Sequence, residues 1–274
     1  MTDAKITMLG TGHATVTKCY NTCFVLEAVG RRLLVDGGGG SGILAQLEKA
    51  DISIASIHDM FITHAHTDHI FGAVWIVRMV LHMMKDGLYE GHLRIYSHDR
   101  VLNVLREICR LTLSDEDFRR LGKSIKLCEL KDGETFSVGH MFIQCFNIHS
   151  IKEKQFGFRA QLPFGVSVVC LGDEPFHEQN SSYINHADWL LCEAFCLYKD
   201  REKFKPYEKS HSTALEAGIV ANRFKVGHLL LYHTEDTDLA NRRAAYTEEA
   251  AVNYKGKIIV PDDLDVITVD TDYL

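Results

Sequence analysis

The residues best suited to chemistry lie in one short segment, where the sequence FITHAHTDH spans residues 61–69. It contains the pattern H-x-H-x-D-H, formed by His64, His66, Asp68 and His69. Alternation along the end of a strand places His64 and His66 on the same side, and the next two residues fall where the chain turns into a helix. Imidazole and carboxylate groups are ligands for zinc, manganese and iron. The spacing therefore predicts a metal-binding loop.

Four ligands from one loop suit two metal ions better than one, because they cannot all surround a single tetrahedral ion. Further ligands must then come from other segments. Three polar residues, His149, Asp173 and His233, stand at the ends of apolar, strand-like runs. A strand would deliver each of them to the edge of a sheet, so we expect them to complete a two-metal site.

The composition indicates a globular protein. The chain has 274 residues, 46% hydrophobic and 24% charged, which are ordinary values, and we expect one domain over residues 1–274. The net charge of −7 argues weakly against a protein whose main role is to coat nucleic acid. Eight scattered cysteines predict buried thiols in a reducing compartment.

No segment predicts contact with a membrane. The longest apolar stretch, residues 70–84, contains Arg78 and His82 and is shorter than the ~20 residues that a bilayer requires. The N-terminal residues lack the pattern of a signal peptide. We therefore expect a cytoplasmic protein.

Strand and helix patterns alternate along the chain. In the first half, strands are expected at 5–9, 23–28, 32–36, 60–63 and 93–97, with helices from 69 onward and at 100–113. The strands 140–147, 156–161, 166–171 and 189–193 then follow one another as a meander. Helices at 213–224 and 239–253 flank a strand at 228–232. This order favours two sheets with helices outside them.

A glycine-rich segment follows the strand at 32–36. Gly37, Gly39 and Gly42 satisfy the pattern G-x-G-x-x-G of nucleotide-cofactor sites. The surrounding elements begin with a β-hairpin, however, and not with the βαβ unit that such a site requires. We interpret the segment as a flexible turn.

With these motifs, the sequence resembles the metallo-β-lactamase superfamily over essentially its whole length. The resemblance implies an α+β fold, a four-layer αββα sandwich of two mixed sheets flanked by helices, with two divalent metal ions at one edge. Zinc is expected, and manganese and iron are the alternatives. The resemblance also implies that Asp36 supports the metal-binding residues without binding a metal itself. The first ion would be held by His64, His66 and His149, the second by Asp68, His69 and His233, and Asp173 would bridge them.

Two further motifs resemble the ribonuclease Z and phosphodiesterase branch of this superfamily. Residues 210–213, SHST, resemble its H-S-T loop, and residues 192–195, CEAF, resemble its H-E-A-T motif with Cys192 in place of histidine. The resemblance implies that Glu193 orients His211 beside the leaving group. Taken alone, Ser212 and Thr213 are ordinary residues for the start of a helix.

The mechanism expected from these residues is hydrolysis of a phosphodiester. Two ions about 3.5–4 Å apart would share an activated hydroxide and stabilise the attacking and leaving oxygens. Asp68 would position the hydroxide or take its proton, and His211 would donate to a phosphoryl oxygen or to the leaving oxygen. The basic residues of the loop 198–209 either face a phosphate or lie in solvent. We predict a metal-dependent hydrolase in which Asp68, His211 and Glu193 are catalytic.

The expected substrate is small, such as a cyclic nucleotide or a short oligonucleotide. Ribonuclease Z enzymes commonly grip tRNA with a long arm, in the bacterial type between the third histidine motif and the bridging aspartate, and too few residues separate His149 from Asp173 to hold one. The alternatives are a tRNA 3′-end endonuclease that grips RNA with a partner subunit, and a lactonase, thioesterase or arylsulfatase. A non-catalytic binding module has no reason to keep seven ligands. Relatives are often homodimers, and Met79, Met83 and Met84 are expected in the core or a dimer interface.

Overall fold

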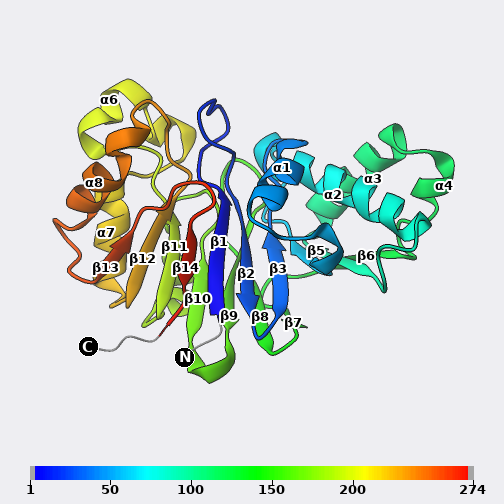
Figure 1. Cartoon of the computed structure of the whole chain (residues 1–274). Helices are drawn as coiled ribbons and strands as arrows, with labels where there is room; N and C mark the ends of the chain where they lie inside the picture. Colours follow the sequence, from blue (N-terminus) through cyan, green and yellow to red (C-terminus); the bar gives the residue numbers. More distant parts are fainter. Residues whose placement is uncertain (1–3, 271–274) are drawn as a thin grey trace.

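The structure, a computed structural model, describes residues 4–270. Its centre consists of two sheets that face each other (Figure 1). The first sheet contains β1 (Ala4–Gly10), β2 (Cys23–Ala28), β3 (Arg31–Val35), β4 (Asp59–Phe61), β5 (Leu93–Ser97), β6 (Ile125–Glu129) and β14 (Val266–Thr268). The second contains β7 (Thr135–Val138), β8 (Met141–Asn147), β9 (Phe156–Gln161), β10 (Ser167–Cys170), β11 (Trp189–Glu193), β12 (His228–Tyr232) and β13 (Lys257–Ile259).

Helices cover the outer face of each sheet (Figure 1). The first sheet carries α1 (Gly42–Lys49), α2 (Thr67–Lys85), α3 (Asp99–Thr112) and the short α4 (Asp115–Phe118). The second carries the short α5 (Ser181–Ile184) and α6 (Arg201–Phe204), and the longer α7 (Ala214–Arg223) and α8 (Leu239–Ala250). Single 3₁₀ turns lie at η1 (Ile54–Ser56), η2 (Pro163–Gly165), η3 (Glu178–Asn180), η4 (Tyr198–Asp200) and η5 (Tyr207–Lys209). The predicted αββα sandwich is confirmed.

Alternation along the strands builds the layers, as β11 shows. Trp189 and Leu191 lie in the core between the sheets, whereas Leu190 and Cys192 pack under the helices on the outer face. Successive side chains of a strand point to opposite faces, so a strand covered on both sides reads as a continuous apolar run. This is why the sequence pattern located β11 and β12 at their observed bounds.

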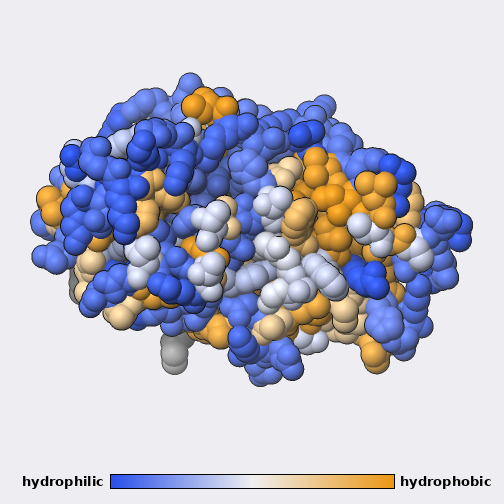
Figure 2. Space-filling model, turned by 90° about the horizontal axis from the view of Figure 1, so that it is seen from above, coloured by the Kyte–Doolittle hydropathy of each residue, from blue (hydrophilic) through white to orange (hydrophobic). Residues whose placement is uncertain are grey.

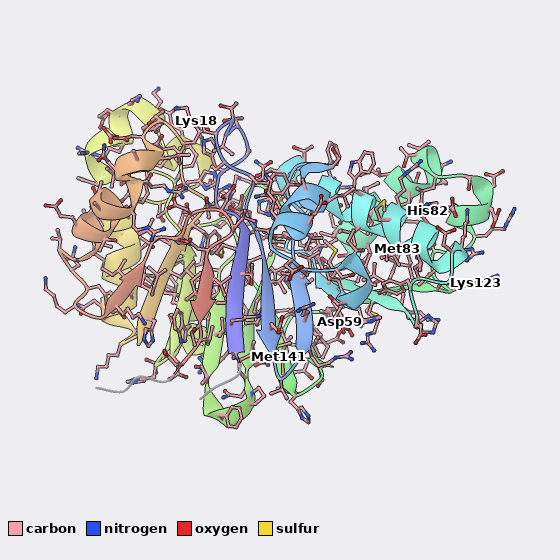
Figure 3. The ribbon with its side chains drawn as sticks, in the orientation of Figure 1. Lys18, Asp59, His82, Met83, Lys123 and Met141 are labelled. Carbon is pink, nitrogen blue, oxygen red and sulfur yellow. The ribbon has the colours of Figure 1, made fainter. Side chains whose placement is uncertain are left out.

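Strand direction brings the functional loops to one edge. The strands run β14-β1-β2-β3-β4-β5-β6 in the first sheet and β13-β12-β11-β10-β9-β8-β7 in the second. The pairs from β3 to β6 and from β10 to β13 are parallel, so their carboxyl ends share an edge. The loop after β1, marked by Lys18, lies at this edge, and Asp59 at the start of β4 lies lower in the molecule (Figure 3).

The predicted meander is right for three strands and wrong for the fourth. β8, β9 and β10 pair antiparallel, but β11 runs parallel to β10. The reason is the connection 171–188, which carries η3 and α5 and returns the chain to the opposite edge before β11 begins. The strands β6, β7, β13 and β14 were not predicted from the sequence. The last two have only three residues each, none of them buried.

Other sequence expectations can be compared with residues 4–270. None of the helices there has both the length and the apolar character needed to cross a bilayer. All eight cysteines are free thiols, and all are buried except Cys19 and Cys128, which are half-buried. The prediction of one domain over residues 1–274 reaches beyond the described residues and stays a prediction.

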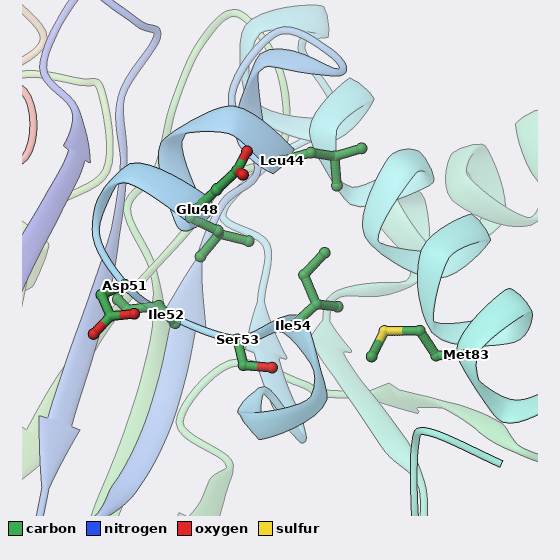
Figure 4. A pocket seen from close by; sticks show the side chains of 8 residues that line it. Leu44, Glu48, Asp51, Ile52, Ser53, Ile54 and Met83 are labelled. Atoms are coloured by element: carbon green, nitrogen blue, oxygen red, sulfur yellow. The ribbon is translucent and has the colours of Figure 1, made fainter. Parts of the chain in front are cut away.

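The helical layer over the first sheet has an apolar surface. Seen from above, the molecule is largely polar over α6 and α8 and apolar over α2 (Figure 2), where Phe71 and Trp75 are exposed. A groove of about 330 Å³ lies between α1, η1 and α2 (Figure 4). Leu44, Ile54 and Met83 line it, so Met83 lies at a groove wall as well as against the core.

Candidate metal centre and active-site cleft

The two sheets bring six of the seven predicted ligands together at their shared edge. The ligand atoms of His64, His66 and Asp173 lie within 4.8 Å of one another. The ligand atoms of Asp68, His69 and His233 form a second cluster of the same size. The first sheet supplies the loop after β4, and the second supplies the residues after β10 and β12.

Asp173 lies between the two clusters. Its Oδ2 is 3.6 Å from His64 Nε2, 3.8 Å from His69 Nε2 and 3.6 Å from His233 Nε2. One carboxylate thus faces imidazoles of both clusters, which is the position that a bridging ligand requires.

Residues from distant segments hold these ligands in place. Asp36 Oδ2 accepts a hydrogen bond of 2.7 Å from His69 Nδ1, and its two oxygens also accept from the backbone and hydroxyl of Thr63. Gln155 donates to Asp173 Oδ1 and accepts from the Asp173 backbone. A carboxylate behind a ligating histidine fixes the ring and raises its basicity. Asp36 therefore occupies the supporting position that the resemblance implied.

The glycine segment after β3 positions the start of α2. The Gly37 N–H donates to the His69 carbonyl, and the Gly72 N–H donates to the Gly38 carbonyl, both at 2.9 Å. A Cβ on Gly72 would lie 1.7 Å from the Gly37 oxygen. The glycines are needed because two backbones touch. The segment is a turn, as predicted, but it is packed and buried at Gly37 and Gly38, and not the flexible turn expected from the sequence.

Several strand-end residues of the site have strained backbones. Asp36, His149 and His233 have φ values of 57°, 62° and 58°, in the left-handed region that non-glycine residues rarely adopt. Such residues concentrate at active sites, where the surrounding structure over-determines them. Each of the three follows a strand that ends at the shared edge.

Burial and mutual contact shift the protonation of the cluster. Burial lowers the pKa of His64 and of His233 well below the usual value. Burial also opposes a charge on His69, but the carboxylates of Asp68 and Asp36 raise its pKa well above the usual value. Despite burial, the imidazoles of His64 and His233 hold the pKa of Asp173 well below its usual range. A cation that binds here must displace the proton of His69, so binding tightens as pH rises.

The donor set fits divalent metal ions. Four imidazoles and two carboxylates converge from two sheets, and in these described residues the buried Nε2 of His69 has no hydrogen-bond partner. Buried polar atoms are normally paired, and neutral imidazole with carboxylate is the preferred set for zinc and its neighbours. The residues could therefore hold two ions.

His149 differs from the other predicted ligands. It follows β8 at the same edge, but its side chain is exposed, and it belongs to none of the clusters found among residues 4–270. Its backbone N–H donates to Asn147 Oδ1 at 2.8 Å. The structure does not bring it to the other ligands, and its role in holding a metal stays a prediction.

Glu193 and His211 meet beside the clusters. Glu193, the last residue of β11, is fully buried, and its oxygens accept from the backbone of Ser212 at 2.5 Å and of Phe195 at 3.1 Å. His211 Nδ1 lies 3.6 Å from Glu193 Oε2. Burial raises the pKa of Glu193. Because Nδ1 faces this carboxylate, the other ring nitrogen of His211 is available to the cleft.

His211 also lies close to two of the metal-ligating residues. A third group of ligand atoms, from Asp173, His211 and His233, also lies within 4.8 Å. The His211 ring stacks on Phe195 with centroids 4.8 Å apart and planes 5° apart, which fixes its orientation. The residue is thus placed either to donate a proton at the metal edge or to contribute to a metal site.

The clusters open into a cleft of about 320 Å³. Besides the ligands, it is lined by residues that the sequence analysis did not single out as functional: His13, Lys152 and Phe195. The His13 ring lies 4.7 Å from Phe195, and Lys209 Nζ lies 4.9 Å from the same ring. His13 follows β1 at the shared edge, a position that the strand pattern alone would have indicated. The cleft therefore combines two lysines with the carboxylates of the clusters.

The loop 198–209 meets the cleft at one end only. Of its basic residues, Lys209 lines the cleft. Arg201 lies over the Tyr198 ring at 4.0 Å, and Lys205 pairs with Glu208 at 3.1 Å. Lys209 is therefore placed at the cleft, whereas Arg201 and Lys205 make contacts within the loop, and contact of the loop with a phosphate stays a prediction.

Comparison with known proteins identifies relatives over most of the chain. A profile of the family described as "Anti-Pycsar protein Apyc1" matches residues 4–245. The protein named Ribonuclease Z of Thermococcus sibiricus is 26% identical over 310 aligned residues, covering 98% of this chain and 97% of the relative. That of Archaeoglobus fulgidus is 27% identical, with coverages of 94% and 95%.

Solved structures share the architecture. The metallo-β-lactamase fold protein YhfI of Bacillus subtilis matches with a TM-score of 0.76 at 20% identity, over 96% of this chain and 98% of that one. The short form of human tRNase Z matches with a TM-score of 0.74 at 21% identity, over 97% and 99%. These likenesses confirm the fold, and the family profile covers most of the chain. The protein has the metallo-β-lactamase fold and belongs to the Anti-Pycsar protein Apyc1 family.

Proposed function

We propose that this protein is a two-metal phosphodiesterase that acts on a small phosphodiester, such as a cyclic nucleotide or a short oligonucleotide. The observation that carries the proposal is the pair of buried His/Asp clusters joined by Asp173, with His211 directly beside them. Two ions bound there would polarise the phosphoryl group and activate water for in-line displacement. His64, His66 and Asp173 would hold one ion, and Asp68, His69, His233 and Asp173 the other, with His149 proposed as a further ligand of the first.

The residues of the chain supply positioning and proton transfer. Asp68 is buried beside His69, with its Oδ2 3.3 Å from Nε2, and it would orient the attacking water or accept its proton. His211, held between Glu193 and the Phe195 ring, would donate a proton to the leaving oxygen. Glu193 would orient His211 and stabilise its charged form. Lys209 and Lys152 line the cleft and would attract the anionic phosphate.

The shape of the second sheet supports a small substrate. Between β8 and β10 the chain contains only β9 and the 3₁₀ turn η2. No arm extends from this interval in residues 4–270, and the cleft of about 320 Å³ is the size of sites for small molecules. A tRNA would have to be held by other surfaces.

A tRNA 3′-end endonuclease is the second candidate. It is supported by the two relatives described above that are named Ribonuclease Z, which align with 98% and 94% of this chain, and by the short form of human tRNase Z among the structural neighbours. In that case a partner subunit would provide the grip on RNA.

We further propose zinc as the bound metal, a homodimer as the assembly and the cytoplasm as the location. The imidazole-rich ligand set supports zinc, and a zinc-bound PqqB structure shares the fold. Exposed Phe71 and Trp75 on α2 support an interface between copies, because apolar side chains at the surface favour association. Sedimentation of the zinc-loaded protein would test the assembly.

The function is tested by assaying the zinc-loaded protein on two substrates side by side: 3′,5′-cyclic nucleotides and a precursor tRNA with a 3′ trailer. Asp68→Ala is the blank. Hydrolysis of the cyclic nucleotides alone would support the proposal. Accurate removal of the trailer, with intact cyclic nucleotides, would favour the second candidate. Inactivity toward both, with cleavage of a lactone, thioester or aryl sulfate, would replace the phosphodiesterase by another hydrolase.

A further inference from the structure

His211 lines a second hollow in addition to the metal cleft. Besides the metal cleft, its side chain lines a second pocket of about 220 Å³. Residues from four segments complete the wall: Phe176 after β10, Cys192 in β11, Tyr207 in η5, and Glu216 and Val220 in α7. None of the six clustered metal ligands lines this pocket. It is a separate hollow that adjoins the cleft at His211.

The walls of this pocket suit a flat heterocycle. Phe176 is half-buried and packs against Phe224 with ring centroids 5.0 Å apart, so one aromatic wall is held from behind. Tyr207 is 52% exposed, and its aromatic ring also lines the pocket. Aromatic side chains bind nucleobases of any sequence by stacking.

A fixed carboxylate adds a polar contact to the same pocket. Glu216 Oε2 accepts from the backbone and hydroxyl of Thr213 at 2.9 and 2.8 Å, and its Oε1 accepts from the Tyr207 hydroxyl at 3.0 Å. A carboxylate offers about four acceptor positions, so this group can still accept from a ligand. Carboxylates recognise exocyclic amino groups such as N4 of cytosine. The pocket thus has stacking walls and an acceptor.

The place of the pocket relative to the reaction follows from His211. Its Nδ1 faces Glu193, so its other nitrogen serves the reacting phosphate. In the proposed function this nitrogen protonates the leaving oxygen. The part of the substrate attached to that oxygen must then lie beside His211, where the second pocket is found.

We propose that this pocket binds the nucleobase on the leaving-group side of the phosphodiester. The inference rests on the proposed function and adds to it the place where the base of the nucleotide binds. Bases with an amino group are expected to bind best, since Glu216 accepts hydrogen bonds. Loss of a stacking wall is expected to weaken binding by about 10-fold.

The first test is binding of free nucleosides to the zinc-loaded protein, measured by saturation-transfer NMR. Nucleosides carry no phosphate, so the result is independent of hydrolysis. Val220→Trp fills the pocket from a half-buried position on α7, and Ile219→Trp, at the exposed neighbouring position, is the matched control. We expect saturation of the base protons in the wild type and the control, and its loss in Val220→Trp.

Further variants keep the test decisive if Val220→Trp does not fold. Tyr207→Ala removes an exposed wall and is expected to raise the KM for cyclic nucleotides about 10-fold with little change in kcat. Glu216→Gln preserves a residue able to cap α7 and is expected to reduce the preference for amino-bearing bases.

The outcomes separate the two proposals. Absence of nucleoside binding in the wild type, or equal binding in Val220→Trp and the control, would overturn the base pocket whatever the enzyme hydrolyses. Nucleoside binding that depends on Val220 and Tyr207, in a protein that cleaves no phosphodiester, would leave the pocket standing and overturn the phosphodiesterase.

Discussion

Two hollows of nearly equal size differ in the residues that line them. The groove between α1 and α2 measures about 330 Å³ and the metal cleft about 320 Å³. The groove is lined by aliphatic side chains and Met83 with Glu48 and Asp51 among them, whereas the cleft is lined by lysines and by imidazoles and carboxylates that converge on one point. Volume therefore does not distinguish them. What distinguishes the cleft is its position at the carboxyl ends of parallel strands from both sheets, where loops can deliver polar groups without breaking either core.

The two hollows also differ in how their walls are supported. In the cleft, Asp36 backs His69 and Gln155 clamps Asp173, so side chains are held by partners far away in the chain. The groove walls are held by apolar contacts with the neighbouring core. Directional support of this kind is required where geometry decides chemistry, and packing alone suffices elsewhere.

The largest effect is expected from removing the carboxylate shared by both clusters. Asp173→Ala takes away the group within 3.8 Å of three imidazoles, so we expect loss of bound metal and a fall in hydrolysis of about 10⁴-fold or more. Metal content by elemental analysis and the rate on a cyclic nucleotide measure it. Met83→Ala in the groove is the control and should keep both. Full metal content in Asp173→Ala would contradict the bridging role.

The next effect separates proton donation from metal binding. His211→Ala should lower kcat by about 10²-fold or more while metal content stays unchanged, because the six other residues still form both clusters. Elemental analysis beside steady-state kinetics checks this. A parallel loss of metal would instead assign His211 to the third cluster, with Asp173 and His233.

A smaller effect on metal affinity is expected from Asp36, which holds a metal-ligating residue in place. Asp36→Asn should weaken metal affinity by about 10–100-fold, because Asp36 orients His69. Asp59→Asn is a matched control: this carboxylate is equally buried in the neighbouring strand, but it pairs with Arg94 at 2.7 Å away from the site (Figure 3). Competition with a chelator measures affinity. Equal weakening in both variants would show a general loss of stability and not a role at the site.

The pH dependence of stability provides a further test, through His98, which follows β5. Burial, together with Lys154, lowers the pKa of His98 to about 4, whereas histidine in an unfolded chain titrates near 6.5. The unfolded chain thus binds a proton first, and stability should fall as pH decreases from 6.5 to 4, by about 3 kcal/mol from this residue. Urea unfolding of the wild type and of His98→Phe across this range measures the difference. If the free energy of unfolding fell equally with pH in the wild type and in His98→Phe, His98 would not be the source of the loss.

The smallest effect on activity is expected in the groove. Leu44→Ala removes part of a half-buried wall, so the free energy of unfolding should fall by about 1 kcal/mol. Hydrolysis should remain within about two-fold of wild type, since the groove shares no lining residue with the cleft. A large loss of activity would show that the groove contributes to the reaction.

The sequence alone predicted much of the architecture because its signals are local. Strands covered on both faces, such as β11 and β12, read as continuous apolar runs and were located at their observed bounds. The H-x-H-x-D-H loop carried its chemistry in its spacing, and Asp173 and His233 were found as polar ends of apolar runs. Local periodicity could not predict the parallel pairing of β10 and β11, because the direction of β11 depends on the path of the connection between them.

Only the tertiary structure decided which residues meet. The contacts of Gln155 with Asp173, of Thr22 with His233, and of Gly37 with Gly72 join segments that no local pattern relates. The same holds for His13, which enters the cleft from the first sheet, and for His149, whose side chain stands apart from the clusters. Types and spacings of residues determine which chemistry is available. The packing of two sheets determines which of those residues come within reach of one another.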